Sequence, residues 1–347
     1  MFETEHEAIL YCNEPAAGLR AIIAIHSTRL GPALGGTRIF PYQNEQDALQ
    51  DVLLLSRAMT YKAAAADLPF GGGKAVIVAD PGDPEKPKKL KAFCRYLNML
   101  GGSFQTGEDL GTTTEDILYM RQFTNLAHCT AADLPDWMET SALTARGVLR
   151  GIEASLEHRF GSADLSSRTI AIQGLGKVGL RLARLLKEKK ARLIVSDIDA
   201  ELAAKTATEL NCLRIDAREI LAADADVFCP CAIGRILNSE SIGRLRVPIV
   251  AGCANNQLSE DSIAEVLRQR DVLYAPDYVI NAGGLISALL EMGLGKEKDV
   301  LAQVDAIGNR QPAAGALQKI RYRTLLYVAG RESLCGTKTQ RGKQKLT

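Results

Sequence analysis

The sequence predicts an α/β protein with two domains and a cleft between them. A length of 347 residues suggests about two domains, given a usual domain size of ~150 residues. From residue 168 onward, apolar runs of strand length alternate with helical segments, which is typical of parallel βαβ units. We expect an N-terminal α/β domain over residues 1–143, a doubly wound domain over residues 144–309 and an atypical basic segment over residues 310–347.

The N-terminal elements are predicted from apolar spacing. Residues 19–28 form an apolar run typical of a strand, and residues 31–40 are interpreted as a glycine-rich turn. Apolar positions at helical spacing predict a helix over residues 46–66. The remaining predictions in this half are a buried strand over residues 73–81 and helices over residues 85–100 and 116–125.

The sequence changes character near residue 135, where a proline and the only tryptophan precede a helix start. Thr144 is expected at or near the N-cap of a helix that runs to His158. A polar linker at residues 161–167 follows this helix and precedes the alternating strands and helices.

Composition limits the kind of protein. The chain is 46% hydrophobic and 24% charged, as in ordinary globular domains. No apolar run reaches the ~18 residues of a membrane span and the N-terminus lacks a signal pattern, so we expect a cytoplasmic protein. The eight cysteines are scattered and are interpreted as reduced core residues. Cys229-Pro230-Cys231 is the only close pair, and with no second Cys or His cluster we expect no metal site.

Charge is unevenly distributed, although the net charge is only +1. Residues 310–347 contain nine Lys or Arg residues and a single acid, Glu332. A basic segment of this kind can attract nucleic acid or an anionic surface. Few aromatic residues are interleaved with the charges, so we favour a solvated end and do not expect a nucleic-acid or membrane partner.

Two lysines lie close together in the stretch MTYKAAAADLPFGGGKAVIV, residues 59–78. Lys62 lies on the predicted helix, and Lys74 follows three consecutive glycines, which we interpret as a turn. Glycine is costly to order, so such a turn is typical of a place where the backbone approaches a ligand closely. A lysine held there loses water, which favours its neutral form and makes it a usable base. Two solvated lysines beside a flexible loop are the simpler alternative.

A dinucleotide fingerprint follows the linker. Gly174, Gly176 and Gly179 form G-x-G-x-x-G between a strand at residues 169–173 and a helix at residues 177–189. In such a motif the three glycines provide a tight turn, close approach to pyrophosphate and close helix–strand packing. The spacing predicts a Rossmann-type nucleotide-binding domain. A glycine-rich turn with no ligand is the alternative.

The same motif indicates which dinucleotide is bound. The helix start at Lys177 and Val178 offers unpaired N–H groups to the phosphates. Asp197 ends the next strand, at residues 191–197, where a carboxylate accepts hydrogen bonds from the adenosine ribose and repels a 2′-phosphate. We therefore expect NAD as the cofactor.

A third candidate catalytic group is Asp109, in TGEDLGTTTED. An aspartate beside two lysines would be held ionised and could pass protons, although a turn or capping role is an equal alternative. The four histidines, at positions 6, 26, 128 and 158, lie in no catalytic motif, so lysine chemistry is favoured over a His–acid pair.

At these motifs the chain resembles the amino-acid dehydrogenases that act on glutamate, leucine, phenylalanine and valine, nearest to the leucine and phenylalanine branch. The matching segments lie within residues 20–290. They are GPALGGTRI (31–39), the lysine stretch (59–77), TGEDLGTT (106–113), TARGV (144–148), QGLGKVG (173–179), PCAIGRILN (230–238), VAGCANNQL (250–258) and YAPDYVINAGGLI (274–286).

The resemblance implies reversible oxidative deamination, in which an L-amino acid, NAD and water give a 2-oxo acid, ammonia and NADH. By analogy, Lys62 and Asn256 hold the substrate carboxylate, Lys74 activates the attacking water, and Asp109 moves protons to and from the amino nitrogen.

Further roles follow from the same analogy. Gly35 and Gly36 offer backbone groups near the substrate amine, and Thr144, Asn255 and Asn281 seat the nicotinamide. A homo-oligomer is also implied.

The resemblance places four residues around the substrate side chain: Leu34, Gly107, Leu285 and Ala288. None is charged, so a glutamate substrate is disfavoured because a buried unpaired carboxylate is costly. We expect leucine, valine or isoleucine, with phenylalanine as runner-up because Gly107 leaves room. One methylene in such a pocket changes binding by only ~1–3 kcal/mol, so specificity is expected to be mixed.

Two segments depart from the family pattern. The Ser-Pro pair that usually precedes TARGV is absent from METSAL, residues 138–143, and the resemblance ends after Asn309, where the family has a helix that returns across the first domain. Loss of that helix would weaken domain closure and subunit assembly. A catalytically silent NAD-binding protein is the alternative of another class, and the retained Lys62, Lys74 and Asp109 argue against it.

Overall fold

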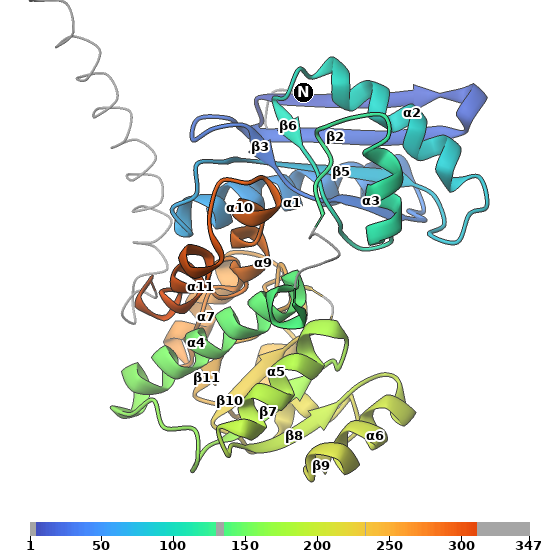
Figure 1. Ribbon diagram of the computed structural model, residues 1–347. Coiled ribbons are helices and arrows are strands. Elements are labelled where there is room, and N and C mark those ends of the chain that lie inside the picture. The colour runs from blue at the N-terminus through green and yellow to red at the C-terminus, as the bar shows by residue number, and fades with distance from the viewer. Residues whose placement is uncertain (1–4, 130–134, 233, 311–347) are drawn as a thin grey trace, which may run out of the picture. The chain divides into compact units, whose positions relative to one another are not determined.

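A computed structural model describes residues 5–129, 135–232 and 234–310 of the chain (Figure 1). The described chain divides into two compact units, with the division between Ala127 and His128. It comes earlier than the boundary expected at residues 143 and 144, which falls inside helix α4 (Thr140–Phe160). The basic segment, apart from its first residue, lies outside the described residues, as does the question of a returning helix.

The first unit is built on a mixed sheet with strand order β1-β2-β5-β3-β6, in which β4 also pairs with β5. The β1–β2 and β2–β5 pairs are antiparallel, whereas β3 and β4 run parallel to β5, and β6 runs parallel to β3. The strands are β1 (Ala8–Glu14), β2 (Leu19–Ser27), β3 (Ala33–Leu34), β4 (Thr37–Phe40), β5 (Gly71–Val78) and β6 (Phe104–Gln105).

Helices α1 (Glu45–Ala65) and α2 (Lys86–Met99) cover opposite faces of this sheet (Figure 1). Both agree with the predicted helices at residues 46–66 and 85–100. Asn44 begins α1 by accepting a hydrogen bond from the backbone N–H of Asp47, a common N-cap arrangement. The third helix, α3 (Thr114–Met120), starts earlier than predicted because Thr113 and Asp116 form a capping box at its N-terminus, and it also ends earlier.

The face of the sheet under α1 contains the lysine of β5. Side chains alternate between the two faces along a strand. Val76 packs in the apolar cluster that joins β2 to α1, so Lys74, two residues earlier, also faces α1. The cluster consists of Ile22, Ala24, Ala48, Val52 and Val76.

The three consecutive glycines begin strand β5, and the turn predicted there is wrong. A Cβ on Gly72 would lie 2.1 Å from the backbone nitrogen of Thr60 in α1, and one on Gly71 would lie 1.9 Å from the carbonyl oxygen of Ser27. Glycine is required because helix and strand backbones approach too closely for a side chain. The glycine-rich turn predicted over residues 31–40 is also wrong, because those residues contain strands β3 and β4.

The second unit contains a parallel sheet with strand order β12-β11-β10-β7-β8-β9. This is the strand order of a Rossmann-type doubly wound domain, as the fingerprint predicted. Alternation of strands with helices produces it, because each parallel connection needs a crossover. The strands are β7 (Thr169–Gln173), β8 (Arg192–Ser196), β9 (Leu213–Arg214), β10 (Val227–Pro230), β11 (Ile249–Val250) and β12 (Leu273–Tyr274).

Helix α4 begins one turn before Thr144, so the predicted N-cap position of Thr144 is wrong. Its hydroxyl donates to the carbonyl oxygen of Thr140 at 2.7 Å, inside the helix. The other helices of the unit are α5 (Lys177–Glu188), α6 (Ala200–Leu210), α7 (Ser262–Gln269), α8 (Asp277–Ile280), α9 (Gly283–Ile286), α10 (Ala288–Glu291) and α11 (Glu297–Asp305).

Short 3-10 turns complete both units: η1 (Pro15–Ala17), η2 (Asp136–Met138), η3 (Ile220–Ala222), η4 (Ser241–Arg244) and η5 (Gly308–Arg310). Across residues 5–129, 135–232 and 234–310, no helix is both long enough and apolar enough to cross a bilayer.

Candidate active site

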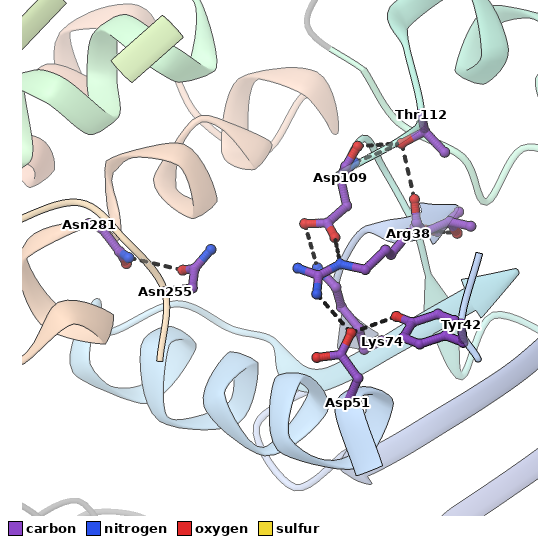
Figure 2. A network of polar contacts seen from close by, with 10 residues as sticks. Arg38, Tyr42, Asp51, Lys74, Asp109, Thr112, Asn255 and Asn281 are labelled. Atoms are coloured by element: carbon purple, nitrogen blue, oxygen red, sulfur yellow. Dashed lines mark hydrogen bonds and ion pairs between the residues drawn. The ribbon is translucent and has the colours of Figure 1, made fainter. Parts of the chain in front are cut away.

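Lys74 and Asp109 form a buried ion pair in the first unit (Figure 2). Lys74 Nζ lies 2.9 Å from Asp109 Oδ1, and the exposed fractions of the two side chains are 6% and 16%. Lys74 is held in the middle of β5, opposite Ala24 of β2. Two groups predicted separately from the sequence are therefore in direct contact and shielded from water.

Arg38 is a further cation on the same carboxylate. Its Nε lies 2.8 Å from Asp109 Oδ2, and its Nη1 lies 2.7 Å from Asp51 Oδ2. Asp51 also accepts a hydrogen bond from the Tyr42 hydroxyl at 2.5 Å. Figure 2 shows these side chains as one chain of contacts from Lys74 to Tyr42.

The electrostatics of this network favour an ionised Asp109. Burial alone would raise the pKa of Asp109, but the charges and hydrogen bonds of Lys74 and Arg38 outweigh it and hold that pKa well below its ordinary value. Burial and the neighbouring Asp51 raise the pKa of Tyr42, so its hydroxyl remains a donor. These contacts therefore favour the ionised form of Asp109 in the resting protein.

The loop that carries Asp109 is anchored by Thr112. The backbone N–H of Asp109 donates to Thr112 Oγ1 at 2.7 Å, and Thr112 Oγ1 lies 3.0 Å from the carbonyl oxygen of Thr37. A Cβ on Gly36 would lie 2.9 Å from Asp109 Cβ and 2.4 Å from the carbonyl oxygen of Glu108. Glycine at position 36 therefore lets this loop pack directly against the sheet.

The other predicted substrate residues of the first unit lie on α1, on or just after β3, and just before Asp109. Lys62 lies on the last turn of α1, the helix above the Lys74 face of the sheet. Leu34 is buried in β3, and the carbonyl oxygen of Gly107 accepts the N–H of Thr37 at 2.9 Å. The N–H of Gly35 donates to the carbonyl oxygen of Gln105, so this donor is already used in a backbone hydrogen bond. The substrate roles of these residues stay predictions.

In the second unit, the three fingerprint glycines have three different surroundings. Gly174 has a φ of +95°, which favours glycine, and a Cβ on Gly179 would lie 2.1 Å from the carbonyl oxygen of Gly174. A Cβ on Gly176, in contrast, would have no heavy atom within 4 Å. These are the tight turn, the close packing and the open space for a ligand that the motif predicts.

The N-terminus of α5 and Asp197 complete the cofactor turn. Gly176 is the N-cap of α5 and makes no side-chain capping bond, so the first N–H groups, at Lys177 and Val178, are not capped by it. Asp197 Oδ2 accepts the N–H of Leu175 at 2.6 Å, which places the carboxylate beside the turn. The residues fit a dinucleotide with pyrophosphate at the helix N-terminus and ribose at Asp197.

The predicted nicotinamide residues form a polar group in the same unit. Asn281 Nδ2 donates to Asn255 Oδ1 at 2.9 Å (Figure 2), while Asn281 Oδ1 is buried without a hydrogen-bond partner. An unpaired buried acceptor suits a carboxamide donor, since such groups are normally satisfied. Thr144 Oγ1 also lies close to Gly284, because a Cβ added at Gly284 would be 2.8 Å from it.

Asn256 and the pocket residues of this unit are also placed. Asn256 has a φ of +50° and accepts the N–H of Arg235 through its carbonyl oxygen at 2.6 Å. Leu285 and Ala288, on α9 and α10, are both buried and apolar. The described residues contain no group of three or more His, Cys, Asp or Glu side chains arranged to hold a metal ion.

Sequence reasoning missed Arg38, Asp51 and Tyr42. Arg38 lies two residues after Gly36, in a segment already singled out, and Asp51 lies on α1, the same helix as Lys62. One signal was available: Arg38 and Asp51 are opposite charges that lie on predicted segments shortly before Lys74 in sequence.

A Rossmann-type domain with a nucleotide turn, on a chain that also holds a buried lysine–aspartate pair, defines a nucleotide-dependent oxidoreductase. Sequence comparison makes the assignment more specific. The model of the Glu/Leu/Phe/Val dehydrogenase dimerisation domain matches residues 6–125, and that of Glutamate/Leucine/Phenylalanine/Valine dehydrogenase matches residues 200–305. The chain belongs to the Glu/Leu/Phe/Val dehydrogenase family and is an amino-acid dehydrogenase. NAD, the predicted cofactor, is the cofactor of this family.

Individual relatives differ in their substrates. The chain is 46% identical to a phenylalanine dehydrogenase from Caldalkalibacillus thermarum, over 83% of this chain and 80% of the relative. It is 42% identical to a leucine dehydrogenase from Geobacillus stearothermophilus, over 85% and 80%. The crystal structure of L-tryptophan dehydrogenase from Nostoc punctiforme has a TM-score of 0.78 and 39% identity, covering 95% of this chain and 97% of that chain.

Proposed function

We propose that this protein catalyses the reversible, NAD-dependent oxidative deamination of an apolar L-amino acid to its 2-oxo acid and ammonia. The observation that carries the proposal is the buried contact between Lys74 and Asp109 at 2.9 Å, with Arg38 on the second carboxylate oxygen. Deamination requires a base at two stages and a proton acceptor near the amine. This pair supplies both in a place largely closed to water.

We assign the roles of the residues by analogy with the family. Lys62 and Asn256 bind the substrate carboxylate, and Asp109 accepts a proton from the substrate ammonium so that its nitrogen lone pair becomes available. Gly174, Gly176 and Asp197 would hold NAD, which would supply the acceptor for the hydride on the substrate Cα. The substrate iminium is then attacked by a water molecule that Lys74 activates. Asp109 Oδ1, in contact with Lys74 Nζ, provides the route for protons between the two groups.

Arg38 provides a second positive charge beside Asp109 in this scheme. Asp109 needs a positive charge beside it throughout proton transfer, because a buried unpaired carboxylate is costly. Arg38 keeps its charge throughout and remains 2.8 Å from Asp109. Asp51 and Tyr42 in turn hold the guanidinium, so a fixed positive charge stays beside Asp109.

For the substrate, we place phenylalanine ahead of the branched-chain amino acids favoured by the sequence alone. Identities of 46% and 45% to two phenylalanine dehydrogenases, against 42% and 40% to two leucine dehydrogenases, support this order. Gly107 has no side chain, and Leu34, Leu285 and Ala288 are apolar and buried, which suits a large uncharged side chain. A homo-oligomer is part of the proposal, supported by the match to a dimerisation domain.

The test is NADH formation at alkaline pH with L-phenylalanine, L-leucine, L-valine, L-tryptophan and L-glutamate as substrates. We expect phenylalanine to give the highest kcat/KM, leucine to be within about a hundredfold of it, and glutamate to be inactive. Lys74→Ala should lower kcat by at least about a thousandfold while NADH still binds. Lys86→Ala is the matched control, because Lys86 pairs with Asp116 at 2.8 Å in the same unit, outside the proposed site.

The outcomes separate the alternatives. If leucine or valine gave the highest kcat/KM, the branched-chain amino acids would be the preferred substrates, as the sequence alone suggested. NADH binding without turnover on any amino acid would support the silent NAD-binding alternative. Near-normal turnover by Lys74→Ala would remove this lysine from the mechanism.

A further inference from the structure

Three thiols gather at the carboxyl end of strand β10, in the second unit. Cys229 Sγ lies 3.5 Å from Cys231 Sγ, and Cys253 Sγ lies 4.0 Å from the carbonyl oxygen of Cys231. Cys229 is buried, whereas Cys231 and Cys253 are partly exposed, and none of the three is in a disulfide. Deamination uses none of them, although Cys229-Pro230-Cys231 is the only close cysteine pair in the sequence.

Cys231 is the central thiol of the group. Hydrogen bonds from Cys229 and Cys253 to its sulfur lower the pKa of Cys231, whereas burial raises the pKa of Cys229. A partly exposed sulfur with a lowered pKa reacts with oxidants, whereas a buried thiol reacts only with a group inside the protein. The arrangement therefore pairs an attacking thiol with a resolving thiol.

We propose that Cys231 is an oxidative modification site, at which a hydroperoxide produces an intramolecular disulfide with Cys229. In the first step the thiolate of Cys231 attacks the peroxide, the O–O bond breaks, and the products are a sulfenic acid and an alcohol or water. In the second step the sulfur of Cys229 displaces the hydroxyl group and loses its proton, giving the disulfide and water. The two thiols lose two electrons, which the peroxide gains.

The site adjoins the cofactor turn. Strand β10 pairs with β7, and the N–H of Cys231 donates to the carbonyl oxygen of Gln173 at 2.7 Å, just before the turn. A Cβ on Gly179 would lie 3.2 Å from Cys231 Cβ, and one on Gly174 would lie 2.8 Å from Ala232. Two sulfurs 3.5 Å apart must approach to about 2 Å to bond. That movement shifts backbone packed against the turn, so we expect oxidation to weaken NADH binding.

The experiment treats the full-length protein with hydrogen peroxide, with and without later dithiothreitol. Peptide mass spectrometry should show the loss of two hydrogens on the peptide that contains Cys229 and Cys231, and their return after reduction. Before oxidation, iodoacetamide should label Cys231 faster than Cys212, a partly exposed thiol outside the group that serves as an internal control. Both measurements use the wild-type chain and need no variant.

Variants and NADH titration identify the partner and the consequence. Cys231→Ser should abolish the mass loss and Cys253→Ser should leave it intact. The oxidised wild-type protein should bind NADH about tenfold more weakly than the reduced form. This last expectation rests on the proposed cofactor site, whereas the mass measurement does not.

Three results would overturn the proposal: oxidation of Cys231 only to sulfinic or sulfonic acid, a disulfide to Cys253, or labelling of Cys231 no faster than Cys212. A disulfide that leaves NADH affinity unchanged would overturn the link to the turn. Failure of the reduced protein to bind NADH would count against the cofactor site alone, because the thiol chemistry is read by mass.

Discussion

At the scale of single residues, the network around Asp109 is a balance of charge in which each group has a partner. Lys74 and Arg38 share the carboxylate of Asp109, and Asp51 and Tyr42 hold the far side of Arg38. A buried ion pair is weak evidence for stability, because desolvation offsets the Coulomb attraction. We therefore attribute this network to a catalytic role and not to the stability of the fold.

Substituting Arg38 tests this explanation. In Arg38→Met the carboxylate of Asp109 keeps one cation, so its pKa should rise, and the acid limb of the kcat/KM profile should move up by about 1–2 pH units. Arg38→Lys keeps the charge and should restore much of the wild-type profile. The measurement is kcat/KM against pH, with thermal unfolding as a check on folding. An unmoved acid limb, with activity lost in proportion to folded protein, would make Arg38 merely structural.

His26 predicts how stability depends on pH. It lies buried in β2, with Nδ1 2.9 Å from the Thr60 hydroxyl, and its ring centre lies 4.8 Å from that of His6. Burial, then the charges of His6 and Arg57, lower the pKa of His26 to about 4, against the opposing charges of Glu5 and Glu7.

Because the folded state then binds fewer protons than the unfolded state between about pH 4 and 6.5, stability should fall as pH drops through that window. The loss attributable to His26 is roughly 3 kcal/mol. Urea unfolding at pH 7.5 and at pH 4.5 or below measures it, and His26→Gln, which can still bond to Thr60, should remove the part of the pH dependence that His26 contributes. An equal dependence in wild type and variant would contradict this assignment.

At the scale of elements, glycines decide how closely strands, helices and turns approach one another. Gly72 in β5 admits the backbone of α1, and Gly179 in α5 admits the carbonyl of Gly174. Close packing requires glycine at both positions. Gly176 differs, because the space above it is open.

Two alanine substitutions in the cofactor turn separate packing from binding. Gly179→Ala places a Cβ 2.1 Å from a carbonyl oxygen and should destabilise the second unit by at least about 2 kcal/mol. Gly176→Ala meets no atom within 4 Å, so it should change stability by less than about 1 kcal/mol yet weaken NADH binding about tenfold. Denaturant unfolding and NADH titration on both variants make the comparison. Unimpaired NADH binding by Gly176→Ala would argue against pyrophosphate at this helix terminus.

At the scale of the whole molecule, the chain combines two units with separate cores and separate tasks. The first has a mixed sheet with the lysine–aspartate pair, and the second has a parallel sheet with the cofactor turn. The predicted cleft between them and the predicted cytoplasmic location stay predictions.

The proposed homo-oligomer is tested on the intact chain. Light scattering coupled to size-exclusion chromatography should give a multiple of the 37.5 kDa chain mass. We expect the assembly to persist at submicromolar concentration, since members of such closed assemblies bury apolar surface between subunits. An active species at the mass of one chain would contradict the proposal and would show that assembly is dispensable for turnover.

Local pattern was sufficient for much of this protein. The period of apolar residues predicted α1, α2 and α5, and the spacing of Gly174, Gly176 and Gly179 before Asp197 predicted the nucleotide turn, because both signals lie within a few turns of chain. It also singled out Lys74 and Asp109 separately, from their neighbours in sequence.

Long-range contacts settled the rest. The glycines before Lys74 form a strand because α1 and β2 approach them, and nothing within residues 71–73 records that approach. Arg38 and Asp51 join Lys74 and Asp109 although they come from β4, α1, β5 and a loop. Charge pairing in a low-dielectric interior depends on distance in space, and folding of the sheet brings these groups within 3 Å of one another.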